Sequence, residues 1–216
     1  MNEHDFYLDI EHFTCFEKKQ ASQLGLILGC GVDSIVIEPC NSLGYGIDSV
    51  LLINRSETKA RYLKVLYSDK TFTSEESELY TRIANLVSKD ASVYEISRLS
   101  PISKDQSSDH IFVELANICQ QWSPDGWKGP LLSGVNFQLK ELLTQLDSLE
   151  LDRFGESSDF TFEVIKSLKK SFQIISDMDG EFRCTLDLHP GQFMYDNDEL
   201  LCIDPAIFSD KYGNVI

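Results

Sequence analysis

Short apolar runs separated by glycine, asparagine and serine fill the first half of the chain. Their β-branched and aromatic content is typical of strands with tight turns, and it predicts strands over 24–28, 34–37, 49–53, 62–67, 92–99 and 110–115. The polar stretch 103–109 is predicted to be the hairpin loop between the last two. Segment 74–87 differs, because its apolar residues recur at helical spacing behind a start rich in Thr, Ser and Glu, and it predicts a helix.

Helical periodicity replaces this pattern in the second half. After a loop over 122–133 that contains Pro and Gly, stripes of leucine and phenylalanine predict two long helices over 136–149 and 160–178. Short strands are predicted over 186–189, 192–195 and 200–203, the last two as a hairpin. The fold class is therefore α+β with two lobes. We expect an N-terminal extension over 1–23, a strand-rich lobe over 24–116 and a helical lobe over 117–216.

Two glycine turns repeat one pattern near the start of the strand-rich lobe. Each reads L-G-x-G followed by V/I-D-S, in Leu28-Gly29-Cys30-Gly31 and in Leu43-Gly44-Tyr45-Gly46. A Gly-x-Gly turn by itself is explained as well by a structural hairpin as by a loop that holds phosphate. The glycines therefore need support from other residues before they indicate a function.

The charge of the chain restricts its partners. With 19 Lys and Arg against 35 Asp and Glu, the formal net charge is −16, which repels nucleic acid and acidic membranes. A basic protein, or a protein surface that normally holds DNA, fits this sign better. The six cysteines form no C-x-x-C pair, which argues against structural zinc, and we expect free thiols in a reducing, cytoplasmic location. We identify neither a secretory signal nor a membrane span of roughly 20 apolar residues.

The strongest chemical signal lies near the C-terminus. It reads Asp187-Leu188-His189-Pro190-Gly191-Gln192, followed after a short turn by Ile203-Asp204-Pro205. Phosphoryl transfer from a nucleotide needs one carboxylate to orient the acceptor hydroxyl and a second to hold magnesium against the phosphates. An Asp in a loop and an Asp at a strand end, joined by one hairpin, bring such a pair together.

This string resembles the catalytic segment of the protein-kinase-like superfamily, D-L-H-P-G-N followed by I-D-P in its atypical and small-molecule members. The resemblance implies a minimal two-lobed kinase-like fold that binds ATP with Mg²⁺. It makes Asp187 the catalytic Asp, puts His189 in the place of the usual catalytic-loop Lys, and makes Asp204 a magnesium ligand. Gln192 stands where the family has an Asn that binds the second metal, one methylene longer.

The family layout also assigns residues in the first lobe. A glycine turn should precede a strand that carries a Lys for the phosphates. Gly44 and Gly46, with Ser49 and Leu51 after them, precede Lys64 in this way, so we prefer the second glycine turn, and the first at Gly29 and Gly31 stays open.

A Glu on the next helix should pair with this Lys. Glu76 has the apolar residues that would face the core at the right spacing, and Glu75 and Glu78 are alternatives. The fifth strand should end in the hinge that reads adenine, with Val113 as gatekeeper and Glu114 to Ala116 as the hinge.

Among kinases, the chain is similar to the small serine/threonine kinases that lytic phages use on host transcription and RNA-processing proteins. Asp179-Gly180-Glu181-Phe182 echoes an acidic stretch of those enzymes, and few residues follow Pro205 to build an activation segment. The resemblance implies phosphorylation of Ser/Thr on basic host proteins, RNA polymerase among the candidates. Two alternatives stay open: an inactive kinase-like acidic protein that inhibits a host nucleic-acid enzyme, and a small-molecule phosphotransferase.

Overall fold

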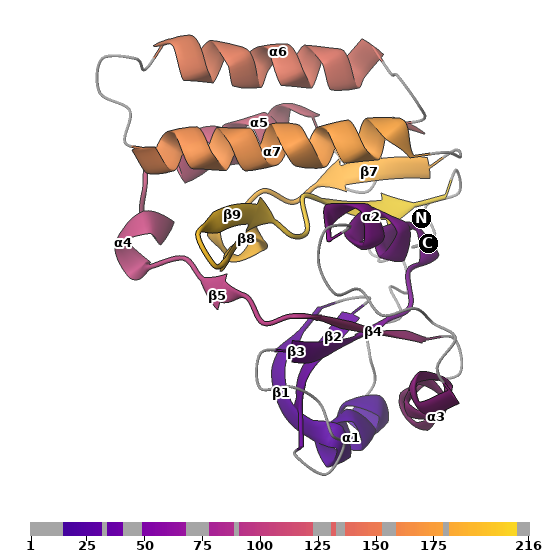
Figure 1. Ribbon diagram of the computed structural model, residues 1–216. Coiled ribbons are helices and arrows are strands. Elements are labelled where there is room, and N and C mark those ends of the chain that lie inside the picture. Colours follow the sequence, from indigo (N-terminus) through magenta and orange to yellow (C-terminus); the bar gives the residue numbers. More distant parts are fainter. Residues whose placement is uncertain are drawn as a thin grey trace, which may run out of the picture. The chain divides into compact units, whose positions relative to one another are not determined.

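The computed structural model (Figure 1) describes residues 15–31, 34–40, 49–67, 78–88, 91–122, 131–132, 137–152, 159–178 and 182–210. The chain forms two compact units. The first comprises Met1–Arg98 with Asn214–Ile216, and the second comprises Leu99–Gly213. The α+β class is confirmed, with an antiparallel sheet in the first unit and long helices in the second.

A four-stranded antiparallel sheet forms the centre of the first unit, in the order β1-β2-β3-β4. Its strands are β1 Gly25–Cys30, β2 Ser34–Pro39, β3 Ser49–Asn54 and β4 Ser92–Ser97. They confirm four of the predicted strands. The register of β1 against β2 shifts between Ile27 and Gly29, which marks a β-bulge in this edge strand.

Two helices, α1 Cys15–Leu24 and α3 Glu78–Val87, pack against this sheet and against each other (Figure 1). Alternate residues of the strands point toward these helices, because successive side chains of a strand face opposite sides. The α1 helix includes part of the predicted N-terminal extension, and its Ala21 belongs to the buried cluster. The buried cluster consists of Ala21, Leu24, Ile35, Ile37, Leu51, Ile53, Ile83, Ala84, Val87 and Val93.

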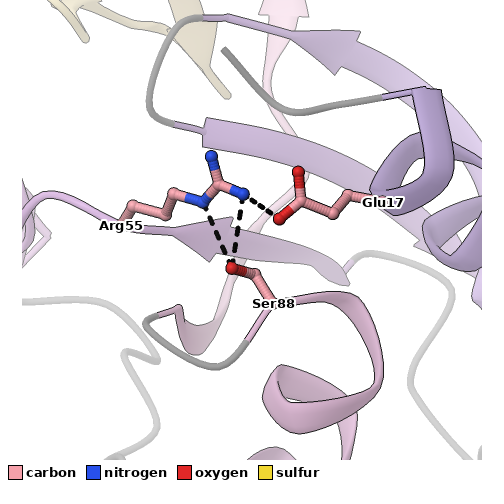
Figure 2. A network of polar contacts seen from close by, with 3 residues as sticks. All are labelled: Glu17, Arg55 and Ser88. Carbon is pink, nitrogen blue, oxygen red and sulfur yellow. Dashed lines mark hydrogen bonds and ion pairs between the residues drawn. The ribbon is translucent and has the colours of Figure 1, made fainter. Parts of the chain in front are cut away.

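One arginine ties both helices to the end of β3 (Figure 2). The guanidinium of Arg55 forms an ion pair with Glu17 of α1, and the side chains of Arg55 and Glu17 are only 17% and 12% exposed. The same guanidinium donates from Nε and Nη2 to the hydroxyl of Ser88, which follows α3, at 3.3 Å each. Because burial strengthens such contacts, this cluster of Glu17, Arg55 and Ser88, the Arg55 cluster, stabilises the first unit.

The segment predicted as the strand 62–67 is instead part of the helix α2 Glu57–Leu66, so that prediction is wrong. Ser56 caps this helix by accepting a hydrogen bond from the Lys59 backbone N–H at 3.0 Å. Glu57 in the first turn and Lys64 in the last turn complement the helix dipole. These end signals outweigh the short apolar run that favoured a strand.

The long helices of the second unit are α6 Phe137–Asp152 and α7 Asp159–Asp177, which confirm both predicted helices. In Figure 1, α7 (orange) lies between α6 and the short strands, and α7 contacts both α6 and β9. Its apolar stripe is buried, as Val164, Leu168, Phe172 and Ile175 illustrate. This helix therefore supports the strands that carry the predicted catalytic string.

The strand and hinge predicted over 110–116 form part of the helix α5 Ile111–Trp122, and the loop predicted over 103–109 contains the short helix α4 Lys104–Ser107. Both predictions are wrong. In α5 the buried residues Ile111, Phe112, Leu115 and Ile118 follow helical spacing, and the Asp109 carboxylate accepts from the Ile111 N–H at 2.9 Å. These helices belong to the second unit, which begins at Leu99.

Short strands complete the second unit in two three-stranded sheets, with the orders β10-β7-β6 and β5-β8-β9. They are β5 Ser100–Pro101, β6 Leu131–Leu132, β7 Phe182–Leu186, β8 Phe193–Asp196, β9 Glu199–Cys202 and β10 Ala206–Ser209. The predicted hairpin over 192–203 is confirmed as β8 and β9. The strand predicted over 186–189 is wrong beyond its first residue, because β7 already ends at Leu186. None of the helices in the described ranges combines the length and apolar character needed to cross a membrane.

Candidate functional site

Two antiparallel strand pairs bring the ends of the predicted catalytic string together. The β7–β10 pair aligns Leu186 with Ala206, and beyond it the Asp187 N–H donates to the Pro205 carbonyl at 3.0 Å. At the base of the β8–β9 hairpin, the Ile203 N–H donates to the Gln192 carbonyl at 2.8 Å. The loop from Asp187 to Gln192 and the segment that carries Asp204 are therefore fixed side by side by backbone hydrogen bonds within one unit.

The loop owes its shape to the His-Pro-Gly-Gln sequence. Pro190–Gln192 forms a 3₁₀ turn, with Pro in its first turn and His189 as the N-terminal cap. The His189 Nδ1 accepts from the Gly191 N–H at 3.1 Å, which places the ring directly over this glycine. A Cβ atom at position 191 would lie 2.9 Å from the ring Cε1, so only glycine fits without moving His189.

Three side chains meet at this turn: Asp187, His189 and Gln192, here called the Asp187 cluster. The Gln192 Nε2 donates to Asp187 Oδ2 at 3.0 Å and also lies 3.0 Å from His189 Nε2. The second oxygen of Asp187, Oδ1, is 3.7 Å from His189 Nε2, beyond hydrogen-bonding distance. Gln192 is buried, whereas the side chains of Asp187 and His189 are 40% and 54% exposed. The buried Gln192 thus holds the Asp187 carboxylate from the protein interior, and the carboxylate remains accessible to solvent.

Asp204 belongs to the same small region. It is half-buried, and its charge reaches the thiol of Cys202 in β9. Burial is the main reason that the Cys202 pKa is raised, and the carboxylates of Asp204 and Asp187 raise it further. Cys119 on α5 behaves similarly, since burial raises its pKa first and Asp187 adds to this. Asp187 and Asp204 therefore share Cys202 as a neighbour inside the second unit, and Asp187 alone also acts on Cys119.

The predicted magnesium site fits Asp204 better than it fits Gln192. Magnesium in nucleotide sites is usually held by one or two carboxylates, with substrate phosphates and waters as the other ligands. A half-buried Asp204 supplies one such carboxylate, whereas the Gln192 amide nitrogen faces Asp187. Within the described ranges, no group of three or more His, Cys, Asp or Glu side chains is arranged to hold a metal. A metal here would therefore depend on the nucleotide for most of its ligands.

A polar network that the sequence analysis did not identify supports the hairpin. The Tyr195 hydroxyl on β8 donates to Glu163 Oε2 of α7 at 3.1 Å and accepts from Gln106 Nε2 of α4 at 2.9 Å. Burial is the main cause that raises the Tyr195 pKa. Because these residues lie far apart in the sequence, no local pattern indicates their contact.

Lys64 and its predicted partners do not form the phosphate-binding strand that the family layout implies. Lys64 is exposed in the last turn of α2, so the strand on which its phosphate contact depended does not exist. Ser49 begins β3 and is half-buried, and Leu51 is fully buried in the core, where it offers no surface to a nucleotide. Glu78 begins α3. The predictions for Gly44, Gly46, Glu75 and Glu76 fall outside the described residues.

The two glycines of the first turn, in contrast, are among the described residues. Gly29 is in β1, and the Gly31 N–H donates to the Ser34 carbonyl at 2.8 Å as the chain enters β2. A Cβ atom at Gly29 would meet no atom within 4 Å, and one at Gly31 would meet only the Ser34 carbonyl oxygen at 3.9 Å. Packing does not require glycine at either position.

The backbone N–H groups of the predicted hinge form helical hydrogen bonds. The backbone N–H groups of Val113 and Glu114 donate to the His110 carbonyl at 3.0 and 3.3 Å, so they are not available to an adenine ring. Val113 is 55% exposed, Ala116 is exposed, and Glu114 pairs with His110 Nε2 at 3.4 Å. The gatekeeper and hinge assignments at these residues are therefore wrong.

Comparison with known proteins gives only a distant likeness. No protein-family profile and no curated protein match the chain. Two solved structures of thermostable mutants of aminoglycoside phosphotransferase APH(4)-Ia are similar, each over 91% of this chain and 73% of theirs. One, in a ternary complex with ADP and hygromycin B, has 11% identity and a TM-score of 0.32. The other, with AMP-PNP and hygromycin B, has 13% identity and a TM-score of 0.29. Both TM-scores are low, so the function proposed below rests on the residues of this chain.

Proposed function

We propose that the chain transfers the γ-phosphoryl group of ATP to a Ser or Thr hydroxyl of a protein, with Asp187 as the residue that orients this hydroxyl. The observation that carries the proposal is the arrangement of two carboxylates around one hairpin. Asp187 is 40% exposed on a turn held by Gln192, and Asp204 lies in the segment whose Pro205 carbonyl accepts from the Asp187 N–H. This is the pair that phosphoryl transfer to an alcohol requires.

In this reaction, the acceptor hydroxyl donates its hydrogen to Asp187 Oδ1, which turns an oxygen lone pair toward the γ-phosphorus. The new O–P bond forms as the bond to the β-phosphate bridging oxygen breaks, Asp187 takes the hydroxyl proton, and ADP leaves. Asp204 would hold a magnesium ion, which when bound neutralises charge on the phosphates. His189, 54% exposed beside Asp187, would contact the phosphoryl group during its transfer.

The acceptor is proposed to be a basic protein, as in the phage kinases that the sequence resembles. A net charge of −16 attracts basic proteins and steers their approach, with a rate that falls as the salt concentration rises. Uncharged small alcohols lack this electrostatic guidance. The charge therefore favours a basic acceptor, here proposed to be a protein, over an uncharged small molecule.

Labelled phosphate transfer tests this function. The chain is incubated with γ-labelled ATP and Mg²⁺ together with a lysine-rich protein, and separately with a panel of small-molecule alcohols. We expect label on Ser or Thr of the protein, and its loss in Asp187→Ala and in Asp204→Ala. Asp177→Ala is the matched control, because Asp177 is an exposed carboxylate of the same unit. Label on the alcohols alone would reassign the acceptor, and the absence of both label and an ATP-dependent thermal shift would refute the proposal.

The same charge favours a second function, in which the acidic surface occupies a basic site on a nucleic-acid enzyme without catalysis. The two functions differ in their dependence on Asp187. Binding of a basic partner that survives Asp187→Ala and does not require ATP would support inhibition. Binding that leads to labelled partner only in the presence of ATP would support transfer.

A further inference from the structure

Gln192 lies where its carboxamide nitrogen meets two polar neighbours. This nitrogen is 3.0 Å from Asp187 Oδ2 and 3.0 Å from His189 Nε2. The family resemblance assigns this position to metal binding, which uses the oxygen end of the side chain. The nitrogen end has its own partner in this structure, and that partner is the carboxylate on which the proposed reaction depends.

The chemistry of the partners shows which contact is firm. An ionised carboxylate only accepts hydrogen bonds, so the nitrogen end of the amide is the one that suits Asp187. His189 is a weaker partner, because its Nδ1 already accepts from the Gly191 N–H at 3.1 Å. A neutral imidazole has one accepting nitrogen, and the contacts of Gly191 and Gln192 with the ring therefore exclude each other as hydrogen bonds. The contact with Asp187 does not compete in this way.

Both residues of this pair are held by their backbones. The Gln192 N–H donates to the His189 carbonyl at 2.9 Å, and the Gln192 carbonyl accepts from the Ile203 N–H at 2.8 Å. The Asp187 N–H donates to the Pro205 carbonyl at 3.0 Å. Gln192 is also buried, at 8% exposure. The backbone of Gln192 is therefore fixed. As a result, the hydrogen bond from its side-chain amide restricts rotation of the Asp187 carboxylate.

We propose that Gln192 is a positioning residue whose amide N–H holds Asp187 Oδ2, so that Oδ1 is the oxygen presented to the acceptor hydroxyl. This inference rests on the function proposed above, in which Asp187 orients that hydroxyl. In this role Gln192, which stands where the family has an Asn, uses its amide N–H to hold the carboxylate. The role belongs to the N–H group, whatever the amide oxygen contacts.

Gln192→Glu separates the two roles, because it keeps the length and the oxygen but replaces the N–H group by a second oxygen. A metal ligand would be improved by this change, since a carboxylate binds magnesium better than an amide does. A positioning residue would instead repel Asp187. We expect kcat to fall about 10²-fold, the loss typical of a misplaced catalytic group, with an unchanged KM for ATP and an unchanged Mg²⁺ dependence. Gln192→Met, which lacks the donor without adding charge, should lose kcat as well.

Gln173→Glu is the matched control. The Gln173 Nε2 also donates to a carboxylate, that of Asp177 at 3.0 Å, but this pair lies exposed on α7. The control should retain the wild-type kcat. Thermal unfolding of every variant shows whether it is folded before its rate is compared.

A second readout does not depend on activity. In ¹⁵N–¹H spectra of the full chain, the side-chain amide signal that disappears in Gln192→Glu belongs to Gln192. We expect this signal to shift in Asp187→Ala, because its acceptor is lost, while the Gln173 amide signal stays in place. An unmoved Gln192 signal, or a Gln192→Glu variant with wild-type kcat, would overturn the positioning role while leaving phosphoryl transfer intact. A wild-type chain without any transfer would instead remove the proposed function, and with it this role.

Discussion

The two units each hold a charged side chain with polar partners, but they expose these charges to different extents. In the Arg55 cluster of the first unit, the guanidinium and the Glu17 carboxylate are 17% and 12% exposed, and Ser88 accepts from the guanidinium (Figure 2). In the Asp187 cluster of the second unit, Gln192 is buried but the Asp187 carboxylate is 40% exposed. The first cluster shields its charged side chains from solvent, whereas the second leaves its carboxylate accessible to solvent.

This difference separates a structural cluster from a candidate reactive one. A charged group that is surrounded by partners stabilises the fold and has no face left for a substrate. A carboxylate held on one oxygen and open on the other combines a fixed position with access, which is what a general base needs. Four measurements on residues of the two units test this difference.

The largest expected effect concerns the packing beneath the Asp187 cluster. Cys184 on β7 and Cys202 on β9 are buried, and burial raises the pKa of both thiols, whereas Cys30 in the first unit is exposed. A raised pKa leaves little reactive thiolate at neutral pH. We expect iodoacetamide to label Cys202 about 10³-fold more slowly than Cys30, because labelling requires opening of the fold. Similar rates, measured by mass spectrometry of digested protein, would show that the strands below the cluster are not packed.

The Arg55 cluster is tested by its contribution to stability. Arg55→Ala removes the guanidinium from the mostly covered Glu17, and we expect a loss of about 2–3 kcal/mol in the free energy of unfolding. Arg98→Ala is the control, because the Arg98–Glu38 pair is 41% and 42% exposed and should contribute less than about 1 kcal/mol. Urea unfolding measures both variants. Equal losses would mean that the Arg55 cluster is an ordinary surface ion pair.

Gly191→Ala tests the shape of the Asp187 cluster. The new Cβ would lie 2.9 Å from His189 Cε1 and would push the ring away from the turn. Since the ring is 54% exposed and can turn toward solvent, we expect a stability loss below about 1 kcal/mol but a kcat lowered about tenfold. Gly29→Ala serves as the stability control, because its Cβ would meet no atom within 4 Å. An unchanged kcat would show that the position of His189 does not matter to the reaction.

The smallest effect is expected at Lys64. This residue is exposed in the last turn of α2, and a surface substitution of this kind usually changes stability by no more than about 0.5 kcal/mol. We expect Lys64→Ala to transfer phosphate within about twofold of the wild-type rate. A loss of about 10²-fold or more would return Lys64 to the phosphate-binding role that the family resemblance implies.

Local sequence patterns identified the strands of the first sheet, the two long helices and the β8–β9 hairpin. Each of these elements has a period or a turn that is visible within its own residues. The pattern failed at 57–66 and at 111–116, where a short apolar run fits a strand or a helix equally well. The signals that decide these cases are the caps at Ser56 and Asp109, which accept from backbone N–H groups at the start of each helix.

For the candidate site, the sequence predicts which backbone segments meet but not which side chains contact each other. The closeness of the segments that carry Asp187 and Asp204 follows from one hairpin, so the sequence indicates it. The contact of Gln192 with Asp187 depends on how a 3₁₀ turn directs two side chains, and no spacing rule provides this. The hydrogen bonds of Tyr195 join segments that are distant in the sequence, so no local sequence pattern predicts them.

The central claim is that Asp187 is the residue that activates the acceptor hydroxyl. The most direct measurement is kcat for phosphate transfer from ATP to a basic protein by the wild type, Asp187→Ala and Asp177→Ala. Since a positioned general base contributes about 10²–10⁴-fold, Asp187→Ala should lose a factor in this range while its unfolding midpoint and the kcat of Asp177→Ala stay at the wild-type values. An Asp187→Ala variant that transfers phosphate at the wild-type rate would contradict the claim.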